Sequence, residues 1–477
     1  MSLRRGLLWG MSAIGALLFA AMLGRVSVTS LSSPSDLAFV LLVAPALALV
    51  RSQALPIYIL AVWVCAPEVR RYVDFVSGQY HALSPISIAP VVCTLTLLIP
   101  LLTQPPRLSR SLRLALQGFV LAFLYAFALG FWHNHFAAIW EMLNYAVPLL
   151  LVLYVQSRQP DTQIRDRWIM SLSVLAVLVA LYGWVQFLTV PPWDAFWMEN
   201  SGMASIGQPK PLLVRVFSTL NSPGPAANFF AIALAPMLFE RKWRRPFGFA
   251  GVFVVASALA LTLVRSAWLM LMVAVLIYVF RARRANRVRA LVGIGAAFIV
   301  VYLLIPHLPG ASVVMARGQT FADLSQDHSA TVRLRFTLGF LPQLLHHLTG
   351  VGFGSTGVAT KLTNDGQLGV YGNFDNGVLD LFYTFGLVCG LVFFIAEWMV
   401  GKALASISPL APHSSLALAL LLAMNLELLS VNVLSGMGGL LLWYVVAVAL
   451  PPPPVTAVDV PNLECPSRAT VGRGAWR

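Results

Sequence analysis

Residues 350–391 read GVGFGSTGVATKLTNDGQLGVYGNFDNGVLDLFYTFGLVCGL. The first half of this stretch is too rich in glycine and polar residues to cross a bilayer, whereas the second half, from about Gly377, is apolar enough to do so. A polar loop is therefore expected to end where a membrane span begins. Asp375 and Asn376 lie at this junction, where a carboxylate can be hydrated and still be close to a lipid-borne substrate. We predict that the reaction site lies here.

The composition of the whole chain agrees with a membrane setting. Hydrophobic residues make up 58% of the 477 residues and charged residues only 10%, and the mean hydropathy is +0.79, outside the range of soluble globular proteins. The sequence therefore predicts an all-α polytopic integral membrane protein with about 12–14 transmembrane helices, since two short neighbouring spans could form one re-entrant unit. The expected spans centre near Gly15, Leu42, Leu60, Leu95, Leu121, Leu149, Val179, Ile232, Val254, Val273, Ala297, Val388, Leu421 and Tyr444.

The basic residues predict the orientation of these spans. The formal net charge is +14, but Lys and Arg occur in short clusters between apolar runs rather than along one face, so they indicate topology and not nucleic-acid binding. By the positive-inside rule both termini lie in the cytoplasm, with Arg70 and Arg71 as the clearest exception. Residues 1–450 are expected to form a single membrane domain, and residues 451–477 a flexible cytoplasmic tail.

Two longer loops lie on the outer side in this topology, at about 189–222 and 307–375. The first is rich in Trp, Pro and Gly, which favours a packed interfacial loop. The second contains TVRLRFTLGFLPQLLHHL, residues 331–348, in which Leu and Phe recur at helical spacing. This pattern predicts an amphipathic helix along the membrane surface. Pro342 is expected to kink or break the helix, and Gly350 to stop it.

Four residues with guanidinium groups fall on the outer face close to span ends: Arg215, Arg265, Arg333 and Arg335. Arg265 is the most informative because it lies between two strongly apolar runs, where a cation is costly unless it faces protein, headgroups or an anionic ligand. Guanidinium groups can bind a diphosphate bidentately and stabilise the charge that develops on it as it leaves. A carboxylate such as Asp375 can accept a proton from an attacking hydroxyl. Together these residues predict transfer from a lipid diphosphate.

Other interpretations of the polar residues stay open. An isolated arginine at the end of a span commonly extends to headgroup phosphates. Glu141, Glu397 and Glu427 lie in or near apolar runs and are conceivable proton-relay groups of a transporter, although Glu141 is also readily explained as an interfacial carboxylate. A transporter would place its polar residues near the midplane rather than at one rim. An assembly subunit with a decayed site is a third class. Histidines and cysteines lack metal-site spacing, so no metal or cofactor is expected.

Four segments, taken in order, resemble the O-antigen ligase and polymerase superfamily of bacterial inner membranes. RVFSTLNSPGPAANFFAIALAPML at 215–238 looks like the family's arginine, turn and entry to a span, and LVRSAWLMLMVAVLIYVF at 263–280 is similar to its arginine-containing segment. Residues 332–357 resemble its arginine, amphipathic helix and Gly-x-Gly turn, and FDNGVLDLFYTFGLVCGL at 374–391 resembles its His-Asn motif followed by glycine. The resemblance covers about 215–391.

The resemblance implies a metal-independent glycosyltransferase of the inner membrane with its active site at the periplasmic face. The donor would be an undecaprenyl-diphosphate-linked glycan, whose diphosphate binds Arg265 in the family's essential-arginine role, together with Arg215 and with Arg333 or Arg335. Asp375 would act as the base, and Asn376 would hold donor or acceptor by hydrogen bonds. The expected partners are the lipid-linked donor, an acceptor glycan or lipid A-core, and membrane lipids, with a chain-length regulator as one further candidate.

One departure from the family bears on the branch. Ligases that join O-antigen to lipid A-core typically carry His before the asparagine, whereas this chain has Asp375 before Asn376. Asp with Asn is similar to many polysaccharide polymerases of the superfamily. The resemblance therefore favours polymerisation of O-antigen or exopolysaccharide repeat units, with the ligase reaction as the alternative and a transporter of lipid-linked sugars or anions as the competing class.

Overall fold

The computed structural model describes residues 33–281, 287–288, 291–292, 295 and 328–451. Of the fourteen expected spans, those centred at Gly15 and Ala297 lie outside these residues, and the other twelve centres fall on helices. The helices are α2 Pro34–Ala48, α3 Leu55–Ser77, η1 Pro85–Ile88, α4 Ala89–Leu95, α5 Leu98–Thr103, α6 Arg110–Asn134, α7 Phe136–Ala146, η2 Val147–Leu149, α8 Leu150–Arg158, α9 Thr162–Thr189, α10 Pro192–Asn200, η3 Ala204–Ile206, α11 Pro223–Phe239, α12 Gly248–Leu261, α13 Arg265–Arg281, α16 His328–His346, η6 Gly357–Leu362, α17 Gly377–Ser406, α18 Pro412–Glu427 and α19 Gly436–Ala449.

Several of these helices are long and apolar enough to cross a membrane. Within the described residues there are five, which are Pro85–Thr103, Arg110–Asn134, Phe136–Arg158, Thr162–Thr189 and Gly377–Ser406. Shorter apolar helices of 10–17 residues accompany them, among them α11 and α19, which are buried along most of their length. Helices that are apolar on all sides belong in the interior of a membrane bundle. The chain is therefore an all-α polytopic membrane protein, as its composition predicts.

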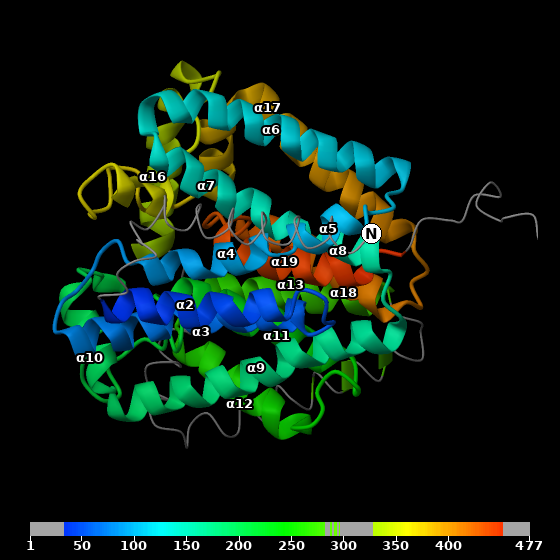
Figure 1. Cartoon of the computed structure of the whole chain (residues 1–477), viewed down its shortest axis with the longest axis horizontal. Helices are drawn as coiled ribbons and strands as arrows, with labels where there is room; N and C mark the ends of the chain where they lie inside the picture. Colours follow the sequence, from blue (N-terminus) through cyan, green and yellow to red (C-terminus); the bar gives the residue numbers. More distant parts are fainter. Residues whose placement is uncertain (1–32, 282–286, 289–290, 293–294, 296–327, 452–477) are drawn as a thin grey trace, which may run out of the picture.

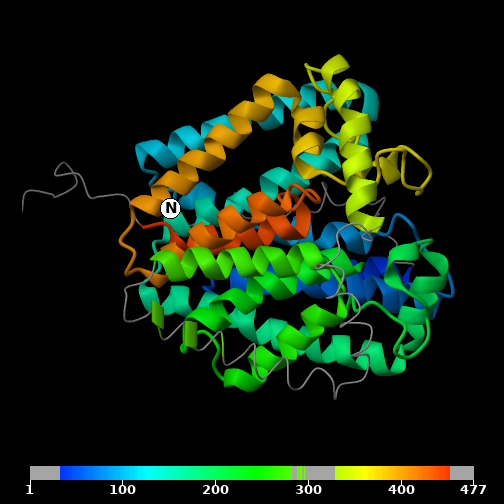
Figure 2. The same ribbon diagram turned by 180° about the vertical axis from the view of Figure 1, so that it is seen from behind.

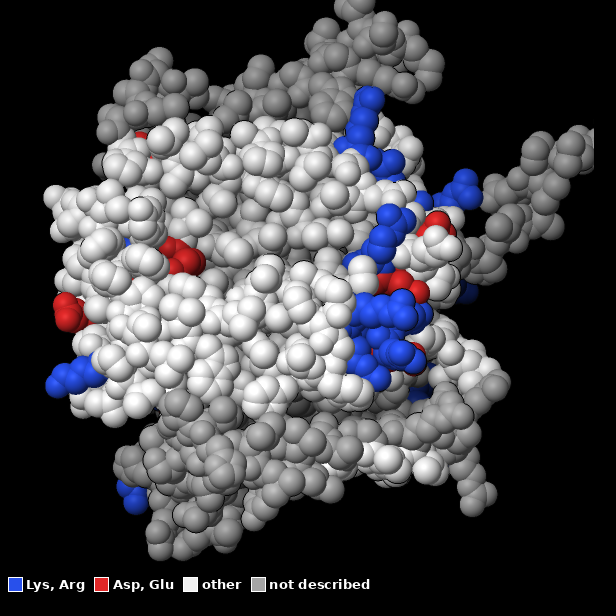
Figure 3. All heavy atoms as spheres, turned by 90° about the horizontal axis from the view of Figure 1, so that it is seen from below, with Lys and Arg blue, Asp and Glu red and all other residues white. Residues whose placement is uncertain are grey.

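Most helices run roughly parallel, and the two ends of the bundle differ in charge. Figure 3 shows Lys and Arg gathered at one end and a broad band of uncharged residues over the middle. Helices α10 and α16 lie at the opposite end, where α16 runs across the direction of the bundle (Figures 1 and 2). This arrangement agrees with basic clusters and long loops on opposite sides.

The loop expected to be packed, at about 189–222, contains α10 and a small apolar core of its own. Its core includes Trp197, Ile206, Val214 and Phe217. Aromatic and aliphatic side chains therefore order this loop from within, which confirms the packed loop that its Trp and Pro content predicts.

The long helix α17 is broken at Gly386. This residue has φ 72° and ψ 170°, so α17 consists of two helical pieces that meet there. The chain after α16 fills the break: the Leu387 N–H donates to the Leu348 carbonyl at 2.8 Å, and the Val351 N–H donates to the Tyr383 carbonyl at 2.9 Å. Figure 2 shows the longer piece beside α6 and the shorter one turning toward α16. The sequence predicts one span from about Gly377, whereas the structure places a short half-helix in front of it, because a glycine can adopt the left-handed backbone of the break.

Of the predicted kink or break at Pro342, the break is wrong, because α16 continues through this proline and ends at His346 before the turn at Gly350. Its packed face carries Phe336 and Phe340, whose rings contact the ring of Phe374 at centroid distances of 5.0 and 4.8 Å. Another face carries exposed leucines at helical spacing, namely Leu334, Leu338, Leu341 and Leu345. A third side carries the exposed polar residues Arg335, Gln343 and His346, so the helix is amphipathic, as its sequence predicts.

Candidate functional site

Arg215 and Arg265 are brought together at the start of α13. The Arg215 guanidinium donates to the carbonyls of Thr262 and Leu263 at 3.2 and 3.4 Å, and Arg265 is the first residue of α13. Both arginines are partly exposed. The N-terminus of a 17-residue helix carries partial positive charge, so this place combines two guanidinium groups with a helix end suited to an anion.

The backbone that carries Arg215 is held on both sides. The Arg215 N–H donates to the Ile206 carbonyl at 3.0 Å, and the Val216 N–H donates to the Leu261 carbonyl at 3.1 Å. The first bond ties the segment to the packed loop at about 189–222, and the second ties it to the end of α12. The position of the guanidinium is therefore set by the fold and not by a free loop.

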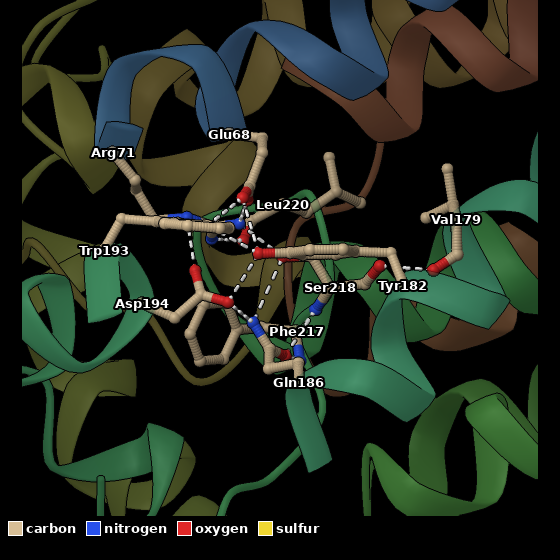
Figure 4. A network of polar contacts seen from close by, with 10 residues as sticks. All are labelled: Glu68, Arg71, Val179, Tyr182, Gln186, Trp193, Asp194, Phe217, Ser218 and Leu220. Carbon is tan, nitrogen blue, oxygen red and sulfur yellow. Dashed lines mark hydrogen bonds and ion pairs between the residues drawn. The ribbon is translucent and has the colours of Figure 1, made fainter. Parts of the chain in front are cut away.

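A buried ionic network fixes the residues that follow Arg215 (Figure 4). Arg71 of α3, whose side chain is 0% exposed, pairs with the buried Asp194 of α10 at 3.0 Å and with Glu68. Its guanidinium also donates to the carbonyls of Ser218 and Leu220. One buried arginine thus neutralises carboxylates from two helices and satisfies two loop carbonyls, as a buried charge requires.

The same network is completed by neutral side chains. Gln186 donates to Asp194 at 2.8 Å and accepts the N–H groups of Phe217 and Ser218 at 3.0 and 2.8 Å. Tyr182 donates to Asp194 at 2.8 Å. Arg71 is therefore an internal structural group, whose charge need not indicate a side of the membrane. Arg70 beside it is also buried and pairs with Asp74 at 3.7 Å.

Glu427, at the end of α18, joins the arginine pair to α16. Its carboxylate is buried, accepts a hydrogen bond from Ser266, the neighbour of Arg265, and lies within electrostatic range of Arg333. With its amide nitrogen turned toward Glu427, Asn228 of α11 donates to the two carboxylate oxygens at 2.9 and 3.3 Å. The buried Glu427 carboxylate, at the end of α18, therefore interacts with the start of α13 through Ser266 and with the start of α16 through Arg333.

Asp375 and Asn376 lie next to Glu427 and its partners. The Gly377 N–H donates to the carbonyl of Leu428, the residue after Glu427, at 2.6 Å. The Asn376 side chain caps α17 by accepting the N–H groups of Val378 and Leu379, both at 3.1 Å. Its amide nitrogen donates to Thr337 of α16 at 3.2 Å. Asn376 thus holds the half-helix of α17 against α16, a role that the sequence alone does not predict.

Asp375 itself is partly exposed. In the part of the chain that the structure describes, no hydrogen bond or ion pair to its carboxylate is recorded, in contrast to the fully engaged Asp194. A carboxylate in this position is available to accept a proton from a group outside the protein.

Arg335 is separated from the other predicted residues. On an α-helix, residues two apart point to opposite sides, and Thr337, which contacts Asn376, shares its face with Arg333. Arg335 is exposed on the other side of α16. Of the six predicted residues, the structure thus brings Arg215, Arg265, Arg333, Asp375 and Asn376 to one region and places Arg335 outside it.

Two further buried carboxylates, Glu141 and Asp380, lie close to each other at the first piece of α17, before the break at Gly386. Glu141 of α7 is buried and accepts the Gly354 N–H and, at 3.5 Å, the Thr356 hydroxyl. Asp380 of α17 is buried, accepts from Asn432 at 2.8 Å, and shares with Glu141 the single proton of the Thr356 hydroxyl, which is donated to one carboxylate at a time. The explanation of Glu141 as an interfacial carboxylate is therefore wrong. The pair instead anchors the glycine-rich loop to α7 and α17, since its oxygens satisfy groups of that loop.

Sequence reasoning missed Asn228, Ser266 and the location of Glu427 in this region. Ser266 follows Arg265 directly, and Glu427 is noticeable as a carboxylate at the end of an apolar run, so both carry a signal. Asn228 sits inside an apolar span as a polar residue, which is costly unless it has a partner. None of these signals names the partner.

The arrangement can bind an anion and accept a proton. Arginines from three separate segments and two helix ends supply positive charge, while Asp375 supplies an available carboxylate close to them. This combination is suited to a substrate that carries phosphate and reacts with a hydroxyl.

Comparison with known protein families gives one match in this region. Residues 250–395 match the family model described as O-Antigen ligase. The matched segment contains Arg265, Arg333, Asp375 and Asn376, and it ends within α17. Among curated proteins, no match to the chain was found.

Proposed function

We propose, from the premise that residues 250–395 belong to the O-antigen ligase and polymerase superfamily, that the chain polymerises lipid-linked glycan repeat units. The family supports a membrane glycosyltransferase of ligase or polymerase type that takes a lipid-linked glycan and an acceptor. The donor we propose is an undecaprenyl-diphosphate-linked glycan. The observation that carries this proposal is the convergence of Arg215, Arg265 and Arg333 on the region around Asp375, two residues before the start of α17.

In this proposal the arginines bind the diphosphate of the donor. Arg215 and Arg265 approach it from the start of α13, and Arg333 approaches it from α16. Guanidinium groups form paired hydrogen bonds with phosphate oxygens and stabilise the charge that builds up as the bond to the sugar breaks. Glu427 orients this group of residues through Ser266 and reduces their repulsion when the site is empty.

Asp375 acts as the base of the reaction. The acceptor hydroxyl oxygen forms a bond to the anomeric carbon of the donor, and its proton passes to the Asp375 carboxylate. The bond between that carbon and the diphosphate oxygen breaks, and the lipid diphosphate leaves with the electron pair. Asn376 positions the base, since it follows Asp375 directly and its side chain caps the helix that begins at Gly377.

The site faces the periplasm in this proposal, and both termini lie in the cytoplasm. Support comes from the positions of α10 and α16 at the end of the bundle opposite the dense Lys and Arg cluster (Figures 1 and 3). Polymerisation is preferred over ligation to lipid A-core because Asp375 occupies the place of the ligase histidine.

The test replaces Asp375 with Ala and follows chain lengthening in membranes. Transfer is expected to fall by about 10²–10⁴-fold, the usual contribution of a general base, while the amount of folded protein stays the same. Asp375→His should restore part of the rate, since an imidazole can also accept the proton. Unchanged polymer length in Asp375→Ala would rule out the assigned role.

A further inference from the structure

A hollow of about 600 Å³ opens at the surface close to the candidate site. It lies between the end of α6, residues 354–355 and the loop at 360–371. We propose that this hollow binds a neutral sugar unit of the glycan substrate. The inference rests on the proposed function and names the class of sugar that the site accepts.

The lining of the hollow has the chemistry of a sugar site. Hydroxyl and amide groups reach it from Asn134, Ser355, Thr360, Thr363, Asn364 and Tyr371. The hydroxyl protons of Ser355, Thr360, Thr363 and Tyr371 are already donated within the protein. The lining therefore offers mainly acceptor oxygens, to which the hydroxyls of a sugar can donate. None of the described residues that line it carries a charge. The volume lies within the range of about 300–1,000 Å³ that holds small ligands.

The walls of the hollow are built before any ligand arrives. Asn134 donates to the Phe353 carbonyl at 2.9 Å, and Ser355 donates to the Gly352 carbonyl at 2.7 Å. On the opposite wall, the Thr360 hydroxyl accepts the Gly369 N–H at 3.0 Å. Because these bonds hold the loops in place, little ordering is left to oppose binding.

The hollow and the arginines differ in charge, so they are expected to bind different parts of the substrate. The phosphate groups of a lipid-linked glycan match Arg215, Arg265 and Arg333, whereas the uncharged hollow offers a uronic acid no cation. Lys361 belongs to the same loop but does not line the hollow. Burial lowers the pKa of this lysine, and the charge of the nearby Arg70 lowers it further. The hollow therefore favours a neutral sugar over an acidic one.

The hollow is physically linked to the proposed base. The Tyr371 ring packs against the Phe374 ring at a centroid distance of 6.0 Å, and Asp375 is the next residue. The Tyr371 hydroxyl donates to Gln343 of α16 at 2.7 Å. One aromatic side chain thus joins the hollow to α16 and to Phe374, the residue before Asp375.

The experiment blocks the hollow without changing the fold. Val370 lines the hollow and is 93% exposed, while Val358 lies outside it in the same loop region and is 66% exposed. The full chain carrying Val370→Cys or Val358→Cys is purified in nanodiscs and measured before and after alkylation with a bulky maleimide. Saturation-transfer NMR then reports binding of neutral hexose and N-acetylhexosamine oligosaccharides and of hexuronic acid oligosaccharides. The alkylated unsubstituted chain controls for the native cysteines.

Alkylation of Val370→Cys is expected to weaken binding of the neutral oligosaccharides at least tenfold, and alkylation of Val358→Cys to leave it unchanged. Hexuronic acid oligosaccharides should bind at least tenfold more weakly than neutral ones. Equal binding before and after alkylation of Val370→Cys, or no binding of any neutral probe, would overturn the proposal. Arg265→Ala should keep this binding while losing transfer, so failure of the sugar site and failure of the proposed reaction are seen separately.

Discussion

Arg71 and Arg265 carry the same guanidinium group in the same region of the molecule, yet their surroundings differ. Arg71 is 0% exposed and pairs with Asp194 and Glu68, and its remaining donors meet loop carbonyls. Arg265 is partly exposed at the start of α13, beside a second arginine. The comparison teaches that an arginine enclosed by carboxylates and carbonyls holds the fold, whereas arginines gathered at an exposed helix end are suited to an external anion.

The largest expected effect comes from breaking the buried network. Arg71→Met leaves Asp194 buried without its cation, and removal of one partner of a buried pair typically costs about 3–5 kcal/mol. We expect the free energy of unfolding, measured by SDS titration of the purified chain, to fall by this amount. Transfer activity should fall only in proportion to the loss of folded protein.

The double variant Arg71→Met/Asp194→Leu is the matched control. Since it removes the fully buried Arg71–Asp194 pair and leaves only Glu68, whose side chain is 19% exposed, it should recover a large part of the lost stability. If the double variant is no more stable than Arg71→Met, the ion pair is not what makes Arg71 necessary, and the contrast with Arg265 loses its basis.

These two arginines also show where sequence reasoning succeeds and fails. The helices are predictable because apolar runs of span length must form helices in a bilayer. Arg265 stands out because a cation between apolar runs needs a reason. Arg70 and Arg71 are puzzling in the sequence because their partners are set by tertiary packing; Asp194 reaches Arg71 only after α10 folds against α3.

The region of the candidate site follows the same division. Asp375 and three of the four arginines lie in one region, and their role in a reaction stays a prediction. The bond from Asn376 to Thr337, the break at Gly386 and the contacts of Glu427 are not predictable, because each depends on a segment distant in sequence. Local pattern identifies the residue types, and packing decides which of them meet.

Arg265→Ala tests the expected role of the partly exposed arginine and has the second largest expected effect. Loss of one charge-stabilising group is expected to reduce transfer by about 10²–10³-fold. The free energy of unfolding should change little, because the residue is partly exposed. Arg265→Lys should restore only part of the activity, since a lysine is a point charge and cannot form the paired bonds of a guanidinium. A loss of stability as large as that of Arg71→Met would assign Arg265 to the structural class.

The smallest expected effect is a difference in transfer activity between two variants of α16, at Arg333 and at Arg335, the second serving as the control. Arg333 shares a face with Thr337 and lies near Glu427, whereas Arg335 is exposed on the other side. Arg333→Gln should lower transfer about tenfold, the worth of one hydrogen bond to a charged group, and Arg335→Gln should leave it within about twofold. Transfer rates in membranes with matched protein levels decide the outcome.

Arg333→Lys checks whether charge alone near Glu427 is sufficient. Equal losses at the two positions would mean that α16 contributes through its general positive charge rather than through one directed side chain, and the diphosphate site would then consist of Arg215 and Arg265.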